Sequence, residues 1–370
     1  MALAIPLAMG ANLLTTVSNG LYRFRVPALR ALVQNLSVLG GILAALLLGS
    51  VLLLGFSIPL AQAVMLLLLV LSLRAIARPR ARGTIARDRQ AWRFFGAALV
   101  PGFGLVLLEQ TNLIVERIVA SHLSEGSVAS LDYARFLVET PIVTLGVGIT
   151  QTLLPTLSDL SAVGDEERFR GSIRTLLLAC LWALLPLSVW LLAFGGDLIR
   201  VVYARGAFNE QSVRTTTAAL AGFTVGLWAW FGGQILQRAY YAQRRLRALL
   251  PLTAVGLVSF ALLSVLWAPR LGVRGISLAF SLSNVLFFAG CLTFLGWRFA
   301  RSVLPSLFYI LAGGGLLLLV GPGIVRAAHP LVRLILGAIL ICLAWTGWTV
   351  LNPATRRLAL ELLRKLRKVA

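Results

Sequence analysis

The sequence predicts an all-α integral membrane protein of about eleven transmembrane helices. Of its 370 residues, 59% are hydrophobic and only 13% are charged, which is more apolar surface than one soluble core of this length could bury. Runs of 18 or more mostly apolar residues recur along the chain, and each can cross the roughly 30 Å of hydrocarbon in a bilayer. These runs are continuously apolar rather than alternating, so we expect helices and not the strands of a barrel.

The apolar runs divide into eleven predicted spans. One long hydrophobic stretch must be cut into two helices, and the division is placed around Gly49 and Ser50. The predicted spans are 2–21, 28–49, 51–74, 94–119, 129–154, 174–195, 212–237, 248–267, 274–297, 304–325 and 331–351.

The basic residues test this division and set the orientation. If the loop after the first span is cytoplasmic, 25 of the 34 basic residues fall on the cytoplasmic side and 7 on the other, while Arg117 and Arg135 lie inside spans. Cytoplasmic loops of membrane proteins carry such an excess of Lys and Arg. We therefore expect a cytoplasmic C-terminus. The net charge of +21 sits in short loops, which favours lipid headgroups over nucleic acid as the partner.

The long basic connection over 75–93 suggests a seam between two lobes. Residues 1–74 form three helices of an N-terminal lobe, and residues 75–93 form a basic cytoplasmic linker. Residues 94–297 form a C-terminal lobe of six helices, and 298–351 add two helices. The tail, 352–370, interleaves leucines with basic residues, and two interpretations stay open for it: an amphipathic segment along the cytoplasmic membrane surface, or a solvated basic tail.

Charged residues inside spans are the informative ones, because a charge at mid-bilayer costs about 3 kcal/mol or more unless a partner or water stabilises it. The span 94–119 carries Glu109, Asn112 and Glu116. Glu109 and Glu116 are seven residues apart and therefore share a helix face.

The next span carries Asp132, Arg135 and Glu139 at spacings of three and four, again on one face. Two interpretations stay open. These residues form ion pairs that only hold the bundle together, or they line a polar cavity for a charged headgroup or coupling ion. Their clustering favours the cavity. Arg135 is the best candidate for an anion contact, since a guanidinium matches phosphate geometry and stays charged when buried.

Residues 109–158 resemble the MurJ/MviN family of lipid II flippases, in the multidrug/oligosaccharidyl-lipid/polysaccharide exporter superfamily. The resemblance begins at Gln110-Thr-Asn-Leu-Ile-Val-Glu116 and Leu123-Ser-Glu-Gly-Ser-Val128. It continues at Tyr203-Ala-Arg-Gly-Ala-Phe208 and Leu271-Gly-Val-Arg-Gly-Ile-Ser-Leu-Ala279.

The resemblance implies a bacterial cytoplasmic-membrane transporter that moves lipid II, an undecaprenyl-pyrophosphate-linked peptidoglycan precursor, by alternating access through a cationic cavity. It implies no cofactor, no metal and no enzymatic reaction, and cell-wall synthesis proteins are candidate partners. Arg135, Glu139, Asp132 and Asn112 would contact the substrate. Glu116, which stands where many relatives carry an aspartate, would serve a coupling cation together with Glu109.

The chain departs from the family pattern in two places. Family members have fourteen spans, and this chain aligns with the last eleven, so the expectation is a bundle truncated at the N-terminus. The family commonly reads Tyr-Ala-Asp-Arg-Leu where this chain has Arg135 in the aspartate's place and Phe136 in the arginine's, which turns the positive charge by about 100°. Two alternatives therefore remain: a flippase for another polyprenyl-linked oligosaccharide, or a non-transporting remnant or scaffold.

Overall fold

A computed structural model describes residues 4–21, 23, 25–50, 52–74, 89–324, 329–351 and 356. Over these residues the chain is helical and forms no strand. Most of the predicted linker 75–93 and nearly all of the tail 352–370 lie outside the described residues. The chain divides into two compact units, residues 1–92 and 93–370.

The first unit holds three long helices and one short one. Its helices are α1 (Ala4–Gly20), α2 (Arg25–Ala28), α3 (Arg30–Leu48) and α4 (Leu52–Arg74). Helix α4 packs against both α1 and α3. Gly49 ends α3 in the left-handed conformation, with φ of 64°, where a residue without a Cβ meets no steric penalty. The predicted cut at this glycine is confirmed.

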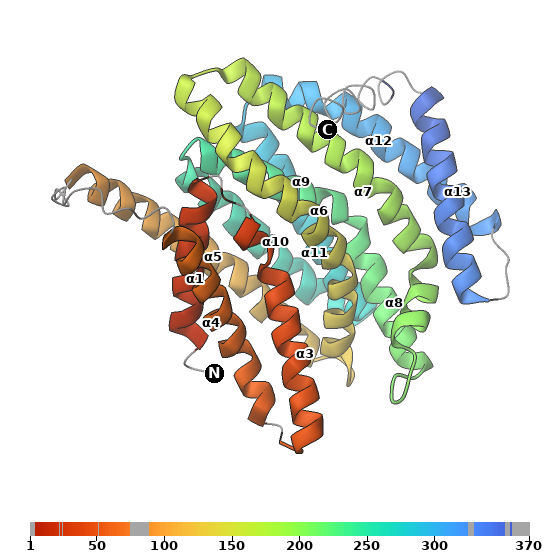
Figure 1. Cartoon of the computed structure of the whole chain (residues 1–370). Helices are drawn as coiled ribbons and strands as arrows, with labels where there is room; N and C mark the ends of the chain where they lie inside the picture. Colours follow the sequence, from red (N-terminus) through yellow and green to blue (C-terminus); the bar gives the residue numbers. More distant parts are fainter. Residues whose placement is uncertain are drawn as a thin grey trace. The chain divides into compact units, whose positions relative to one another are not determined.

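The second unit holds the remaining helices of the described chain (Figure 1). They are α5 (Arg89–Ser121), α6 (Ser127–Val163), α7 (Glu166–Tyr203), α8 (Glu210–Val225), α9 (Leu227–Ala242), α10 (Leu246–Leu271), α11 (Val273–Phe294), α12 (Trp297–Ile324) and α13 (Pro330–Leu351). Helix α7 packs against α8, α9, α12 and α13, and α11 packs against α8, α9 and α10.

Helices α8 and α9 form one broken span, bent by 47°. The break falls at Gly226, whose N–H donates to the Oγ of Ser281 on α11 at 2.9 Å. A Cβ at this glycine would stand 2.5 Å from the Cα of Ser281. The bend therefore rests on a close approach of two backbones that only glycine permits.

Long helices coincide with all eleven predicted spans, with α8 and α9 together covering 212–237. By length and composition alone, seven helices of the described chain can cross a membrane, or eight if the bent pair is one span. The seven are α3, α4, α7, α10, α11, α12 and α13. The three predicted spans that do not meet this test correspond to α1, α5 and α6, and the last two carry the charged residues that the sequence singled out.

Helices α12 and α13, in blue in Figure 1, lie beside α7. The indole N–H of Trp190 on α7 donates to the carbonyl of Leu334 on α13 at 3.1 Å, and Arg333 pairs with Asp197 at 2.6 Å. A Cβ on Gly337 would stand 2.4 Å from the ring of Phe194, so the helices touch closely there. Small residues and inter-helix polar contacts are what hold helices together in lipid.

Candidate functional site

Arg135 on α6 is the centre of the charged cluster. Its guanidinium donates to the carboxylate of Glu116 on α5, and it lies 3.8 Å from the carboxylate of Glu139, one turn along α6. The side chains of Arg135 and Glu116 are only 12% and 5% exposed. Such burial is costly for single ions, and mutual pairing offsets that cost.

Two aromatic rings complete the surroundings of this guanidinium. The Cζ of Arg135 lies 4.8 Å from the ring centroids of Phe223 on α8 and Phe280 on α11. These rings stand edge to face with centroids 5.4 Å apart. A cation on the face of a desolvated aromatic ring is stabilised by about 2 kcal/mol. Arg135 therefore ties α6 to α5, α8 and α11.

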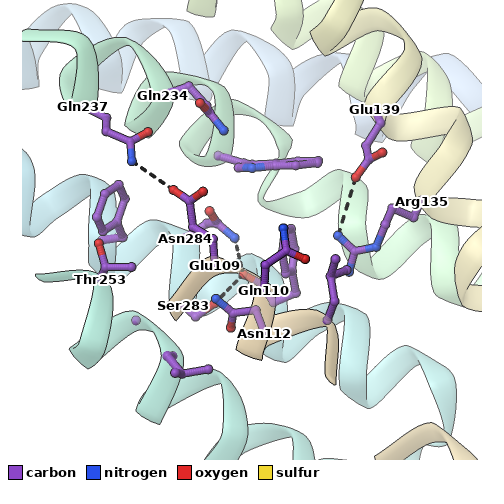
Figure 2. A pocket seen from close by; sticks show the side chains of 16 residues that line it. Glu109, Gln110, Asn112, Arg135, Glu139, Gln234, Gln237, Thr253, Ser283 and Asn284 are labelled. Atoms are coloured by element: carbon purple, nitrogen blue, oxygen red, sulfur yellow. Dashed lines mark hydrogen bonds and ion pairs between the residues drawn. The ribbon is translucent and has the colours of Figure 1, made fainter. Parts of the chain in front are cut away.

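A cavity of about 260 Å³ opens beside this cluster, within the second unit (Figure 2). Five helices supply its lining, namely α5, α6, α9, α10 and α11. The polar lining residues are Glu109, Gln110, Asn112, Arg135, Glu139, Gln234, Gln237, Thr253, Ser283 and Asn284. In Figure 2, Arg135 and Glu139 lie at one side of the cavity and Gln237 and Thr253 at the other.

Helix α5 is joined to the bundle across this region by polar side chains. Over the described residues, its backbone makes no extensive close contact with another helix. Buried Gln237 on α9 donates through its Nε2 to the Glu109 carboxylate at 3.0 Å, and Glu116 pairs with Arg135. These polar contacts join α5 to the bundle beside the cavity, and its buried Leu105 and Ala120 add apolar contacts with the core.

The structure places the predicted site residues in three groups. Glu109, Asn112, Arg135 and Glu139 line the cavity, while Glu116 contacts Arg135 without being one of the lining residues. Asp132 is exposed near the start of α6 and does not line the cavity. Both interpretations of the charged cluster describe part of what is observed, because Arg135 makes an inter-helix ion pair and also borders a cavity.

Sequence reasoning missed the uncharged half of the site. Gln234 and Gln237 lie on α9, Thr253 on α10, and Ser283 and Asn284 on α11. A search for charged residues passed over them, although each is a polar residue inside a predicted span. The usable signal was a carboxamide or hydroxyl in an otherwise apolar helix, which must face a partner or a cavity.

The charges around the cavity differ from the cationic cavity that the family resemblance implies. Three carboxyl groups lie at or beside the cavity: those of Glu116 and Glu139 pair with the single guanidinium of Arg135, and that of Glu109 accepts a hydrogen bond from Gln237. Arg135 is already paired with two of them. Among the described residues that line or directly support this cavity, there is no surplus of positive charge.

Apolar helices long enough to span a bilayer, packed around ionised side chains and a polar cavity, define a multi-pass membrane protein. The family model described as "Lipid II flippase MurJ" matches residues 1–351. The chain belongs to this family, whose members are multi-pass proteins of the inner membrane.

Relatives and a solved structure agree with this assignment. The probable lipid II flippase MurJ of Bdellovibrio bacteriovorus is 29% identical over 60% of this chain and 43% of its own length. That of Thermotoga maritima is 28% identical over 80% of this chain and 58% of its own length. The lipid II flippase MurJ of Burkholderia cenocepacia is 26% identical over 67% of this chain and 46% of its own length. This chain thus spans about half the length of the curated relatives it matches.

The fold is also that of a solved structure, "Lipid II flippase MurJ, inward closed conformation". The TM-score is 0.71 at 20% sequence identity, over 93% of this chain and 71% of the solved one. At this identity the likeness establishes a shared fold.

Proposed function

We propose that this chain moves lipid II across the bacterial cytoplasmic membrane by alternating access, as a transporter and not as an enzyme. Membership of the MurJ family supports this proposal, and so do the names of its relatives. By the distribution of basic loops, the C-terminus would lie in the cytoplasm. Membrane lipids and cell-wall synthesis proteins are the partners that this function implies.

The observation that carries the proposal is the placement of Arg135 and Glu139. Both border a cavity, and the side chain of Glu139 is 43% exposed. Charges that faced acyl chains, or were sealed in a dry contact, could not serve transport. Accessible ionised groups within spanning helices are typical of substrate and ion pathways.

Within this proposal, the acidic residues have the role that their surroundings support best. Glu109 and Glu139 present carboxylates to the cavity, and Glu116 holds Arg135 in place. Hard cations prefer oxygen ligands, so a coupling cation near Glu109 fits this lining. Arg135, Asn112 and Glu139 would meet the substrate from the α5–α6 side, with Asp132 nearer the outer end of α6.

Complementation tests the function. A bacterium depleted of its own lipid II flippase would express this chain, the Glu139→Gln variant, or the Arg135→Ala variant. We expect growth with the unaltered chain and loss of growth with either variant. Arg117→Ala is the matched control, because Arg117 is exposed on α5 and does not line the cavity.

Immunoblots of membranes show whether a variant has lost activity or has lost the protein itself. Glu139→Gln should keep the protein folded, because its side chain is half-exposed and Arg135 stays paired with Glu116. Failure of the unaltered chain, present at normal levels, would contradict the proposal and favour a non-transporting scaffold. Rescue of a strain defective in another polyprenyl-linked glycan, with no rescue of the lipid II strain, would favour the other flippase.

A further inference from the structure

The break between α8 and α9 is built around a hydroxyl group from another helix. In an unbroken helix, the Gly226 N–H would donate to the carbonyl of Gly222, four residues earlier. Here the Oγ of Ser281 on α11 stands between the two groups. It accepts from the Gly226 N–H at 2.9 Å and donates to the Gly222 carbonyl at 2.6 Å. One serine hydroxyl thus takes the place of an intrahelical hydrogen bond, and a polar side chain inserted in this way kinks a helix sharply.

Small residues on both helices bring this hydroxyl to the backbone. Gly222 and Gly226 lie one turn apart, and they face Ser277 and Ser281, which lie one turn apart on α11. A Cβ on Gly222 would overlap the Oγ of Ser277, and a Cβ on Gly226 would stand 2.6 Å from the Oγ of Ser281. Small residues in matching positions let two helices approach closely in lipid. The insertion is therefore part of how α8, α9 and α11 pack.

The inserted hydroxyl lies where water has little access. Ser281 is 3% exposed, and both glycines are buried. A buried polar group without a partner is costly, so the broken backbone must be satisfied from within the protein. The Ser281 hydroxyl also lies 3.2 Å from the carbonyl of Phe223, and the Gly226 N–H is shared with the carbonyl of Thr224. The bent span is fully satisfied at the Gly226 N–H and the Gly222 carbonyl.

A straight span would satisfy the same groups in another way. The Gly226 N–H would donate directly to the Gly222 carbonyl. The Ser281 hydroxyl would donate to the carbonyl of Ser277, as serine commonly does one turn back inside a helix. Ser188 already does so on α7, at 3.1 Å. Because neither arrangement leaves these buried groups unpaired, hydrogen bonding does not strongly favour one of them. Two discrete packings of similar energy are what a conformational switch requires.

The two arms of the broken span carry different parts of the candidate site. Phe223, near the end of α8, lies against the guanidinium of Arg135. Trp230 and Gln234 on α9 line the cavity. A change in the bend would therefore move the α9 wall of the cavity relative to Arg135.

We propose that the α8–α9 break is a hinge and that the Ser281 hydroxyl is the positioning group that holds it bent. When the hydroxyl withdraws, Gly226 bonds directly to Gly222 and the span straightens. The use of this hinge in alternating access rests on the proposed function. The hinge itself is a property of the span and does not depend on which substrate is carried.

Distances between spin labels measure the bend in the full chain in lipid nanodiscs. The labels are placed at Gln211 and Arg245, exposed residues near the two ends of the broken span. Exposed Cys342 is replaced by serine, whereas Cys180 and Cys291 are buried and can stay. Straightening a bend of 47° between two arms of 16 residues would lengthen the label distance by about 4 Å, at 1.5 Å per residue.

Ser281→Ala removes the hydroxyl that holds the bend, and we expect the longer distance in this variant. Ser277→Ala is the matched control, and we expect no change. Ser277 is also buried on α11, but its hydroxyl bonds within its own helix, to the carbonyl of Arg274 at 3.1 Å.

Amide hydrogen exchange at Gly226 distinguishes a hinge from a rigid bend. In a hinge, the Gly226 N–H of Ser281→Ala bonds to Gly222 instead and stays protected. In a rigid bend it loses its partner, and exchange accelerates about fivefold, the effect of one lost hydrogen bond. An unchanged label distance, faster exchange at Gly226, or failure of Ser281→Ala to accumulate in membranes would overturn the hinge.

The hinge and lipid II transport fail separately. A straightened Ser281→Ala variant of a chain that supports no growth would keep the hinge and remove transport. Growth with the unaltered chain, together with an unchanged distance in Ser281→Ala, would keep transport and remove the hinge.

Discussion

The guanidinium carbon of Arg135 lies 4.8 Å from the centre of the Phe280 ring, although 145 positions separate the two residues in the sequence. Phe280 also packs edge to face on Trp230 at the cavity wall. The arginine that pairs with Glu116 is thus linked through one phenyl ring to the opposite side of the cavity. This contact predicts that Arg135 is important for stability as well as for function.

Arg135→Ala should lower the free energy of unfolding by about 3–5 kcal/mol, because it leaves the buried carboxylate of Glu116 without its partner. The double variant Arg135→Ala/Glu116→Gln should regain a large part of this loss. Reversible unfolding in mixed micelles would measure both, with Arg117→Ala as the exposed control. A double variant as unstable as the single one would show that the ion pair is not the cause.

Gln237→Leu should lower the stability by about 1–3 kcal/mol, since the Glu109 carboxylate loses the donor at 3.0 Å that joins α5 to α9. Glu109→Gln in the same background should restore part of the loss, because an amide is less costly to leave unpaired than a carboxylate. The same unfolding experiment applies. An unchanged stability in Gln237→Leu would mean that α5 is held by other contacts.

Gly226→Ala should destabilise the protein by about 1–3 kcal/mol, the typical cost of overpacking. The new Cβ would meet the Cα of Ser281 at 2.5 Å, forcing α8 and α9 away from α11. Gly171→Ala is the control, because no atom lies within 4 Å of a Cβ added there inside α7. It should stabilise the helix by up to about 1 kcal/mol. Equal effects of the two substitutions would refute the close approach at the bend.

Arg333→Ala should lower the melting temperature more than Arg200→Ala. Arg333 pairs with Asp197, which is mostly buried, and ties α13 to α7. The pair of Arg200 with Glu210 is exposed on both sides, and such pairs contribute only about 0–1 kcal/mol. Thermal denaturation followed by tryptophan fluorescence would compare the variants. A larger effect at Arg200 would contradict this ranking.

The positions of the helices could be read from the sequence because local physics determines them. An apolar run of about 20 residues in lipid must satisfy its own backbone hydrogen bonds, and only a helix does so within one segment. For this reason the cut at Gly49 and the helix over 331–351 needed no tertiary information. The same rule singled out Glu116, Arg135 and Glu139 as residues that must avoid lipid.

The tertiary structure decided which of these residues meet, and with what. Glu109 and Glu116 share a face of α5, yet one reaches Gln237 and the other Arg135, while Asp132 stays apart from the cavity. Gln234, Thr253 and Asn284 are polar residues in apolar helices, but the sequence does not show that they face one another; they form one wall only when α9, α10 and α11 come together. Residues separated by more than a hundred positions meet through the packing of whole helix faces. That packing depends on close approaches such as Gly226 with Ser281, which no local pattern in the sequence specifies.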